Sequence, residues 1–415
     1  MTLQQQIAAV LRGLTFDGEK GLMVRTLQPG TLRTLHPESA DGSPEGVVLI
    51  ELPAAAVQSE TADPLSAGTL DHLARTLRRH AGGAVPQLVE VSAVGDFVIG
   101  RSIDELDRIA GGGRADAESQ AGAAAHQDSV AARQSSFAGK LAVVTGGAQG
   151  FGAEIARMLC AVGATVVVAD LNADGAAAAA QELNARSGRR AALSCVVDVS
   201  DEDSVRAMIR TISSEVGGID LFVSNAGVLK AGSVTTLPLK DFEFVTRVNY
   251  TGFFLCTKYA APLMALQWRA ARAIAEDHPG YFSDIIQINS KSGLEGSNKN
   301  GAYAGAKFGG IGLVQSFAKE LVSDGIKVNA ICPGNFFEGP LWSDPDHGLF
   351  TQYLKAGKVP GATSIADVKR HYEQQVPMGR GCRGEDVVRA ILYAVEQKYE
   401  TGQAIPVTGG QVMLS

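Results

Sequence analysis

The stretch KLAVVTGGAQGFG, residues 140–152, decides the predicted fold. Its apolar beginning, KLAVVT, is typical of a strand that is buried on both faces of a parallel sheet. The glycines that follow permit a tight turn, and GAEIARMLCAVG after them predicts a helix. This order places a pyrophosphate at the amino terminus of the helix, although such a turn can also be purely structural. The residues predicted to surround the pyrophosphate are Gly146, Gln149, Gly150, Phe151 and Gly152.

The next predicted strand indicates which dinucleotide binds. TVVVAD, residues 165–170, ends in Asp170. A carboxylate at this strand end can accept hydrogen bonds from both ribose hydroxyls and would repel a 2′-phosphate. The glycine-rich turn contains no Lys or Arg that could bind such a phosphate. NAD is therefore predicted in preference to NADP, and the alternative is that Asp170 only caps a turn.

Further apolar segments complete the predicted sheet. ALSCVVDVS (192–200) and DLFVSNAG (220–227) end in polar or small residues, and IKVNAICPG (326–334) and QAIPVTGG (403–410) follow later. Repeated β-α units of this kind predict an α/β fold with a doubly wound parallel sheet of the Rossmann type. The cofactor-binding residues predicted at these strand ends are Asp198, Val199, Asn225, Ala226, Gly227, Pro333 and Gly334.

The stretch DIIQINSKSGLEGSNKNGAYAGAKFGG, residues 284–310, carries the predicted chemistry. Ser290 follows an apolar strand, at the edge where open α/β sheets bind ligands. Tyr303 and Lys307 are four residues apart, which places both on one face of a helix. A nearby ammonium would lower the pKa of the phenol and suit it to acid/base catalysis, with Ser290 holding the substrate oxygen. The alternative for Tyr-x-x-x-Lys alone is a packed ring beside a solvated amine.

Composition excludes several classes of function. The chain has 415 residues, enough for two domains, and a net charge of −7 with no basic stripe for nucleic acid. No apolar run is long enough for a membrane span, and the amino terminus does not look like a signal peptide. Five scattered cysteines and scattered histidines predict neither a disulfide framework nor a metal site. A cytoplasmic protein is expected.

The first third of the chain differs from the rest. Residues 1–112 predict a small α+β domain, with a strand at 46–52, a helix at 65–80 and a hairpin of two strands at 87–100 about a Val94-Gly95 turn. Ser102 and Glu105 predict a capping box for one more helix. Residues 113–136 are rich in Gly and Ala and are typical of a linker, so the nucleotide-binding domain is predicted at 137–415. Nothing before the linker looks catalytic, and the role of this domain is left open.

With these motifs in hand, residues 137–415 resemble the short-chain dehydrogenase/reductase family. The resemblance rests on TGGAQGFG, SNAG, Asn249, the Ser290, Tyr303 and Lys307 set, and CPG, in the order that the family has them. It implies that Tyr303 is the acid/base, that Lys307 lowers its pKa and binds ribose, that Ser290 binds the substrate oxygen, and that Asn249 maintains a proton relay. It also implies a homotetramer, formed through helices around Phe253 and Phe308. One departure is Glu338, where the family commonly has a Thr that holds the nicotinamide.

A narrower resemblance concerns the substrate. IIQINSKSG and TGQAIPVTGGQVM are similar to members of the family that act on hexitol phosphates. This implies NAD-dependent interconversion of glucitol 6-phosphate and fructose 6-phosphate. Lys291 and Lys299 are the predicted phosphate ligands, Arg380 and Arg383 are a second possible pair, and all four can instead be ordinary solvated charges. Two alternatives remain: an oxidoreductase for an unphosphorylated polyol or another carbonyl, and an inactive member that serves as a binding module.

Overall fold

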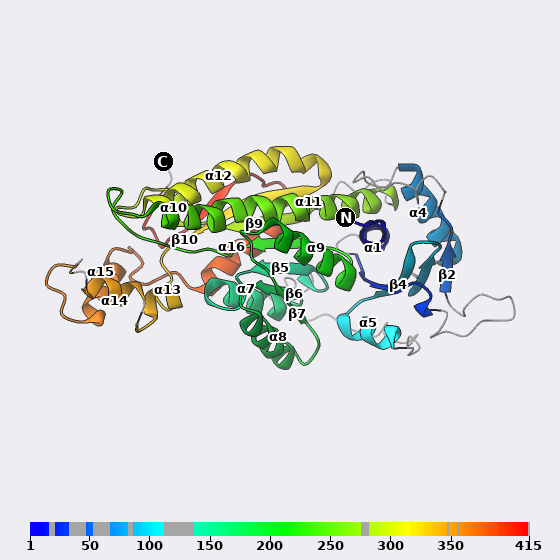
Figure 1. Ribbon diagram of the computed structural model, residues 1–415, viewed down its shortest axis with the longest axis horizontal. Coiled ribbons are helices and arrows are strands. Elements are labelled where there is room, and N and C mark those ends of the chain that lie inside the picture. Colours follow the sequence, from blue (N-terminus) through cyan, green and yellow to red (C-terminus); the bar gives the residue numbers. More distant parts are fainter. Residues whose placement is uncertain are drawn as a thin grey trace.

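The computed structural model describes residues 1–15, 21–32, 47–52, 67–81, 86–111, 137–274, 282–346, 348–355, 357 and 359–413. These residues form a sheet of four strands and a sheet of seven strands. The smaller sheet lies at one end of the molecule, the helices α13 to α15 lie at the other end, and the larger sheet lies between them (Figure 1). None of the described helices is long and apolar enough to cross a membrane.

The larger sheet confirms the predicted doubly wound fold. Its strand order is β11-β10-β9-β8-β5-β6-β7, and all neighbouring strands are parallel. The chain extends the sheet in one direction from β5 and then in the opposite direction from β8, so the carboxyl ends of these two strands form the switch point where such folds bind ligands. The strands are β5 (Leu141–Thr145), β6 (Thr165–Asp170), β7 (Ala192–Val196), β8 (Leu221–Ser224), β9 (Ser283–Ile288), β10 (Ile326–Pro333) and β11 (Ala404–Val407).

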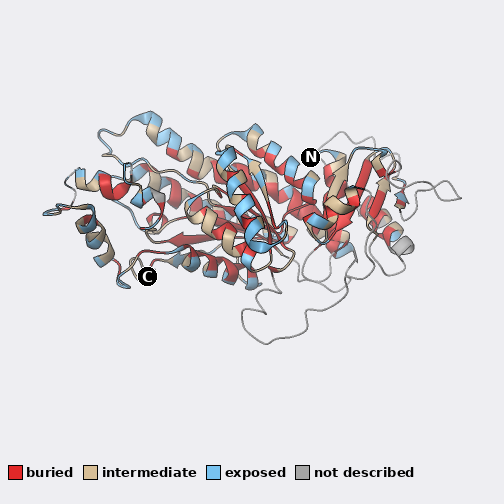
Figure 2. Cartoon of the chain, turned by 90° about the horizontal axis from the view of Figure 1, so that it is seen from below, coloured by how far each residue is buried: buried red, intermediate tan, exposed pale blue. Residues whose placement is uncertain are grey.

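Helices cover both faces of this sheet. One apolar cluster joins the sheet to α9, α11 and α12, and a second joins it to α7, α8 and α16, so the strands are buried on both sides (Figure 2). Local sequence signals set the ends of helix α9: the Asp201 side chain accepts a hydrogen bond from the Ser204 amide, and Gly217 ends the helix with a φ of +82°. The helices are α7 (Gly150–Ala161), α8 (Ala173–Ser187), α9 (Glu202–Val216), α11 (Gly252–Ile274), α12 (Gly301–Leu321) and α16 (Gly384–Glu396).

Three short helices form a lobe beyond the carboxyl edge of the sheet. They are α13 (Pro340–Ser343), α14 (Leu349–Lys355) and α15 (Ile365–Gln374). An aromatic cluster that includes Phe337, Trp342 and Phe350 holds the lobe together, and neighbouring ring centroids in it are 5.0–5.6 Å apart. No pattern in the sequence predicted this lobe.

The amino-terminal unit is a small α+β structure, as predicted. Its sheet has the order β1-β4-β3-β2, and β3 and β4 form the expected antiparallel hairpin. The predicted capping box is wrong in one half: Ser102 accepts a hydrogen bond from the Glu105 amide, but the Glu105 carboxylate accepts from the Arg101 amide instead of the Ser102 amide. The predicted linker lies outside the described residues. The elements are α1 (Leu3–Leu14), β1 (Met23–Leu27), β2 (Val47–Ile50), α4 (Ala67–Ala81), β3 (Leu88–Val91), β4 (Gly95–Gly100) and α5 (Ile103–Ala110).

Helix α1 joins this unit to the larger sheet. It packs along α11, and Gly13 lies so close to α11 that a Cβ atom there would overlap the Gln267 carbonyl. The Arg12 guanidinium forms a salt bridge with Asp220, and both side chains are 0% exposed. The Asp220 carboxylate also accepts a hydrogen bond of 2.8 Å from the Leu141 amide. The two units therefore share one core, anchored at the amino ends of β5 and β8.

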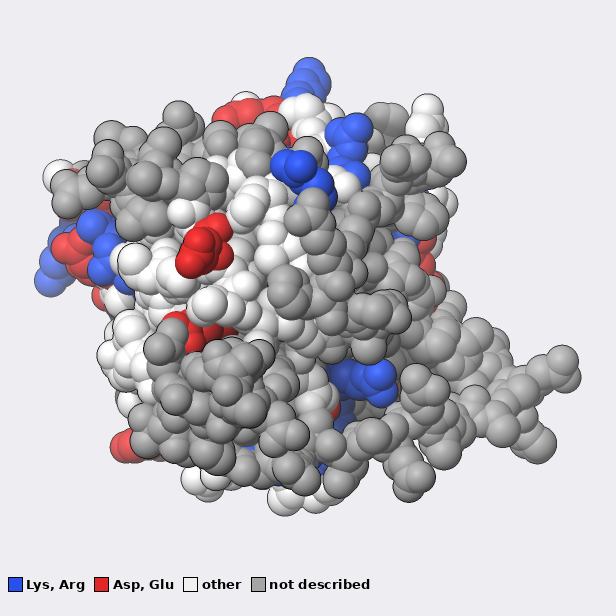
Figure 3. All heavy atoms as spheres, turned by 90° about the vertical axis from the view of Figure 1, so that its right-hand side faces the viewer, with Lys and Arg blue, Asp and Glu red and all other residues white. Residues whose placement is uncertain are grey.

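Ionic contacts surround this junction. Asp107 of α5 pairs with Arg25 of β1 at 2.5 Å and also with Arg190, which precedes β7. On the outer face of the amino-terminal unit, the described charged side chains are scattered and of both signs (Figure 3). The contacts at the junction thus tie the unit to the edge of the larger sheet.

Candidate active site

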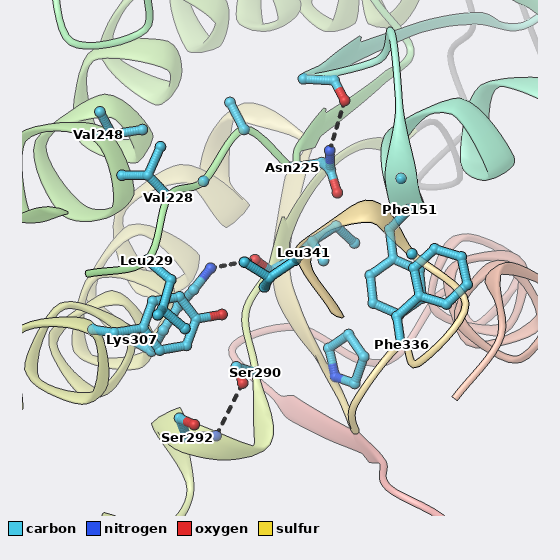
Figure 4. A pocket seen from close by; sticks show the side chains of 18 of the residues that line it. Phe151, Asn225, Val228, Leu229, Val248, Ser290, Ser292, Lys307, Phe336 and Leu341 are labelled. Carbon is cyan, nitrogen blue, oxygen red and sulfur yellow. Dashed lines mark hydrogen bonds between the residues drawn. The ribbon is translucent and has the colours of Figure 1, made fainter. Parts of the chain in front are cut away.

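A cleft of about 910 Å³ opens at the carboxyl ends of the larger sheet and brings most of the predicted site residues together (Figure 4). Its walls come from the glycine-rich turn, the loops after β6 to β10, the start of α12 and the lobe. The predicted residues that line it are Gly146, Gln149, Gly150, Phe151, Asp170, Asp198, Val199, Asn225, Ala226, Gly227, Ser290, Lys291, Tyr303, Lys307, Pro333 and Gly334. Gly152, Asn249 and Lys299 are not among the lining residues.

The glycine-rich turn has the geometry that a pyrophosphate requires. Gly146 has a φ of +62°, and a Cβ atom there would lie 2.9 Å from the Ala226 Cα. The Asn225 side chain donates hydrogen bonds to the carbonyls of Thr145 and Gly146, at 2.9 and 3.1 Å, and so fixes the turn. The N-cap residue of α7, Gln149, makes no side-chain capping bond. The amides of the first turn of α7 are therefore open to an anion.

Asp170 lies in the cleft at the end of β6. Its carboxylate accepts hydrogen bonds of 3.0 Å from the amides of Ala148 and Asn172, which orient it beside the glycine-rich turn. Asp198 is held similarly, by the amide and hydroxyl of Ser200 at 2.8 and 2.7 Å. Both carboxylates have oxygen atoms that can accept further hydrogen bonds, so capping a turn does not exclude binding a ribose or an adenine.

Ser290, Tyr303 and Lys307 lie around the same part of the cleft. The Ser290 hydroxyl caps the 3-10 turn Lys291–Gly293 by accepting a hydrogen bond of 3.1 Å from the Ser292 amide. Tyr303 and Lys307 lie one turn apart near the start of α12, with the ammonium 5.5 Å from the centre of the Tyr303 ring. The ammonium is buried and donates a hydrogen bond of 2.8 Å to the Ile288 carbonyl. A hydroxyl, a phenol and a cation thus line the same cleft.

The pKa values differ from the expectation at Tyr303. Burial raises the pKa of the phenol, and the hydrogen bond with Ser290 only partly offsets it. Burial also lowers the pKa of Lys307 to about 8. The net direction at Tyr303 is thus opposite to the expected one, because loss of hydration dominates and the Lys307 ammonium donates its hydrogen bond to the Ile288 carbonyl. The predicted effect of Lys307 on the phenol stays a prediction.

Asn249 occupies an unusual backbone position. It lies in the π-helical turn Arg247–Thr251, between α10 (Leu239–Thr246) and α11. Its side chain accepts a hydrogen bond from the Val228 amide at 2.8 Å and donates one to the Val228 carbonyl at 2.7 Å. Asn249 thus fixes the loop after β8, and its predicted part in a proton relay stays a prediction. π-Helical turns occur often at functional sites.

The four predicted phosphate cations separate in space. Lys291 lines the cleft, and burial lowers its pKa. Lys299 is exposed outside the lining, with a φ of +56°. The Arg380 guanidinium binds both carboxylate oxygens of Asp386, at 2.6 and 2.9 Å, and neither it nor Arg383 lines this cleft. A further cation, Lys230, which no sequence motif indicated, lines the cleft from the loop after β8.

Other lining residues were also missed. One is Phe336, which stacks on the predicted Phe151 with the ring centroids 4.4 Å apart and the planes at 13°, between the glycine-rich turn and the loop after β10 (Figure 4). The lobe contributes Tyr353 and Tyr372 to the wall. Glu338 is exposed outside the lining. The only signal in the sequence was the number of aromatic residues between 336 and 372, which periodicity does not connect to Phe151.

Comparison with known proteins agrees with the site. Residues 140–341 match the sequence model of a family described as short chain dehydrogenase. Sorbitol-6-phosphate 2-dehydrogenase of Escherichia coli (strain K12) is 39% identical over 277 residues, which cover 66% of this chain and 99% of that protein. The 3-oxoacyl-[acyl-carrier-protein] reductase FabG of Aquifex aeolicus (strain VF5) is 30% identical over 274 residues, with 66% and 97% covered.

Solved structures are similar over the same share of the chain. Sorbitol-6-phosphate 2-dehydrogenase SrlD from Erwinia amylovora has 39% identity and a TM-score of 0.59, with 66% of this chain and 100% of that chain covered. The Pseudomonas aeruginosa RhlG/NADP active-site complex has 27% identity and a TM-score of 0.55, with 66% and 96% covered. In both comparisons, a third of this chain lies outside the match.

Proposed function

This chain belongs to the short-chain dehydrogenase family, a family of oxidoreductases with a nicotinamide cofactor, and we propose that it oxidises glucitol 6-phosphate to fructose 6-phosphate with NAD and catalyses the reverse reaction. The observation that carries the proposal is the convergence of Ser290, Tyr303 and Lys307 on a cleft that Asp170 also lines. The relative from Escherichia coli supports the choice of substrate, since this chain matches it over 99% of its length.

The residues present fit a dinucleotide. The glycine-rich turn and the open amides of α7 would hold its pyrophosphate, and Asp170 would accept hydrogen bonds from the adenosine ribose. Asp198 would lie beside the adenine, and Lys307 would bind the second ribose. When bound, NAD supplies the acceptor that takes a hydride from C2 of the substrate.

Ser290, Tyr303 and Lys307 carry out and assist the transfer of the proton of the C2 hydroxyl. The Ser290 hydroxyl donates a hydrogen bond to the C2 oxygen and orients it toward Tyr303. The phenolate of Tyr303 accepts the proton of the C2 hydroxyl, which leaves a carbonyl at C2. In the reverse direction the Tyr303 phenol returns this proton to the carbonyl oxygen. The positive charge of Lys307 favours the phenolate in the transition state, where a preorganised charge is most effective.

The choice of cofactor is tested through Asp170. We expect a clear preference for NAD over NADP in kcat/KM, because the carboxylate repels a 2′-phosphate. Asp170→Ala should shift the preference toward NADP. A parent enzyme that already prefers NADP, as bound in the RhlG complex, would contradict this part of the proposal.

The substrate is tested with a panel of polyols and carbonyl compounds. We expect glucitol 6-phosphate to exceed free sorbitol by at least about a hundredfold in kcat/KM, which corresponds to roughly 2.7 kcal/mol. The relative that reduces 3-oxoacyl groups favours carbonyl reduction as the second candidate, so the panel includes a 3-oxoacyl thioester with NADH and NADPH. A binding module would turn over none of these compounds.

For assembly, we propose a homotetramer built through α11 and α12. Phe308 of α12 is 47% exposed. On α11 the exposed ring is Phe254, whereas Phe253, named from the sequence, is buried and packs against Phe317. Light scattering at micromolar concentration tests this point, and a monomer would contradict it.

A further inference from the structure

We infer that Lys230 and Lys291 together form the subsite for the phosphate of the substrate, and that Lys299 is not part of it. This inference rests on the proposed function, because it assigns the far end of the same substrate. It also adds a residue, Lys230, that no motif had indicated. Lysine binds phosphate as a point charge with three donors, so two lysines can share one dianion.

The first support is that both ammonium groups are available. Lys230 and Lys291 line the cleft, and neither forms a hydrogen bond or an ion pair through its side chain with any described residue. Glu295 acts on Lys291 only from beyond ion-pair distance. In contrast, the third lysine of the cleft, Lys307, already donates to the Ile288 carbonyl. Two unpaired cations facing one cavity are complementary to an anion.

The second support is the separation of charge along the cleft. Asp170 and Asp198 lie at the ends of β6 and β7, in the half that fits the dinucleotide. Among the described residues, the lysines that line the cleft come from the loops after β8 and β9 and from α12, around Ser290 and Tyr303. The remaining lining carboxylate, Asp344 of the lobe, accepts a hydrogen bond from the Asp346 amide. A dianionic substrate would therefore be attracted to the catalytic half of the cleft.

The third support is that both lysines stand on positioned backbone. Asn249 holds Val228, two residues before Lys230, and the Ser290 hydroxyl caps the turn that begins with Lys291. The two loops are also joined to each other, since the Gly232 amide donates a hydrogen bond of 2.8 Å to the Lys299 carbonyl. Preorganised supports reduce the cost of ordering flexible side chains around a ligand.

The hydrogen bond between the two loops also explains why Lys299 does not belong to the phosphate subsite. The backbone carbonyl of Lys299 accepts this hydrogen bond, and its φ is +56°. Its side chain is exposed and is not among those that line the cleft. Lys299 thus has a structural role, although it lies close to Ser290 in the sequence. Lys230 is far from Ser290 in the sequence, yet it lines the cleft. Lys299 provides a control of the same residue type on the same loop as Lys291.

The experiment compares Lys230→Met, Lys291→Met and Lys299→Met in the full-length enzyme with saturating NAD. For each variant, kcat/KM is measured on glucitol 6-phosphate and on sorbitol, and their ratio isolates the contribution of the phosphate. We expect the ratio to fall at least tenfold for Lys230→Met and for Lys291→Met, and less than twofold for Lys299→Met. Inorganic phosphate should compete with glucitol 6-phosphate in the parent, and its inhibition constant should rise at least fivefold in Lys230→Met.

The outcomes distinguish the two claims. If the parent uses sorbitol and its phosphate equally well, the proposed substrate fails and the subsite fails with it. If the parent prefers the phosphate but Lys230→Met keeps the ratio of the parent, the proposed function stands and the subsite is overturned. A ratio that falls only in Lys299→Met also overturns it. Melting temperature and NAD binding of each variant, with Lys230→Gln as a second substitution, separate loss of a ligand from loss of fold.

Discussion

The carboxyl ends and the amino ends of strands β5 and β8 contact different parts of the molecule. At the carboxyl ends lie the glycine-rich turn and Asn225, which form the cleft. At the amino ends lie Leu141 and Asp220, where the amino-terminal unit is anchored through Arg12. Strands of this length separate the two ends by roughly 15 Å. The same strands therefore carry chemistry at one edge of the sheet and attachment at the other.

The buried cations at the two ends show the contrast. Arg12 meets a carboxylate, so its charge is compensated and the pair serves as a fixed joint. The Lys307 ammonium donates to a carbonyl and forms no ion pair with a described carboxylate, and burial lowers its pKa to about 8. An uncompensated charge in a cleft is costly to maintain, and such groups concentrate at functional sites. Of these two buried cations, the one that pairs with a carboxylate has a structural role, and the one that donates to a carbonyl lies in the catalytic cleft.

The largest expected effect is at the carboxyl edge. Tyr303→Phe removes the transferable proton and little else, so turnover should fall by about 10²–10⁴-fold. NAD binding, followed by quenching of intrinsic fluorescence, and the melting temperature should stay close to those of the parent. A variant that keeps most of its steady-state rate would show that Tyr303 is not the acid/base.

The next effect is at the amino edge and should appear in stability. Arg12→Met leaves the Asp220 carboxylate buried without its cation, which typically costs about 3–5 kcal/mol of unfolding free energy. The rate per folded molecule should not change, since the cleft lies at the other end of the strands. Chemical denaturation combined with active-site titration measures both.

A matched double variant tests the cause of that loss. Arg12→Met with Asp220→Asn removes both charges and should recover part of the stability. If the double variant is as unstable as the single one, the loss comes from packing of the Arg12 side chain and not from charge. A fall in kcat of the folded fraction would break the division between the two edges.

The sequence predicts features formed by residues that are close along the chain, but it does not predict contacts between residues that are far apart along it. Asp170, Ser290, Tyr303 and Lys307 each lie next to a strand end or on one helical turn, and all four line the cleft. Arg12 and Asp220 are 208 positions apart and carry no shared signal.

The same limit explains the other omissions. The stacking of Phe151 on Phe336 and the bonds of Asn249 to Val228 depend on three-dimensional packing. Because nothing before the linker looks catalytic, a truncated chain that begins near Ser136 is expected to keep its catalytic constant. The structure adds that it would lose the cation bound to Asp220 and uncover the surface of α11 that α1 contacts.

The pH dependence of the catalytic rate should come from residues at the carboxyl edge of the sheet alone. Because burial raises the pKa of Tyr303, the phenolate fraction and hence kcat/KM for alcohol oxidation should rise with pH, by up to about tenfold per unit. Lys307, with a pKa of about 8, loses its charge above that pH, so the rise should then become shallower. Ketose reduction should fall with pH. A flat profile from pH 6 to 9 would contradict these assignments.

The smallest effect is expected at the rim of the junction between the two units. Asp107 bridges Arg25 and Arg190, but its side chain is 37% exposed, so water and salt screen the pairs. Asp107→Asn should therefore cost only about 0.2–1 kcal/mol of unfolding free energy, well below the loss for Arg12→Met. Burial raises the pKa of Asp107, but hydrogen bonds from Arg25 and Arg190 outweigh it and lower the pKa overall. A carboxyl group with a lowered folded pKa stabilises the fold above its unfolded pKa, near 3.8, and this contribution disappears as the pH falls through the folded value. The difference in stability between the parent and Asp107→Asn should accordingly be present at pH 7, shrink in 1 M salt, and vanish in acid. A loss as large as that of Arg12→Met, and insensitive to salt, would mean that the rim and not the buried pair fixes the amino-terminal unit to the sheet.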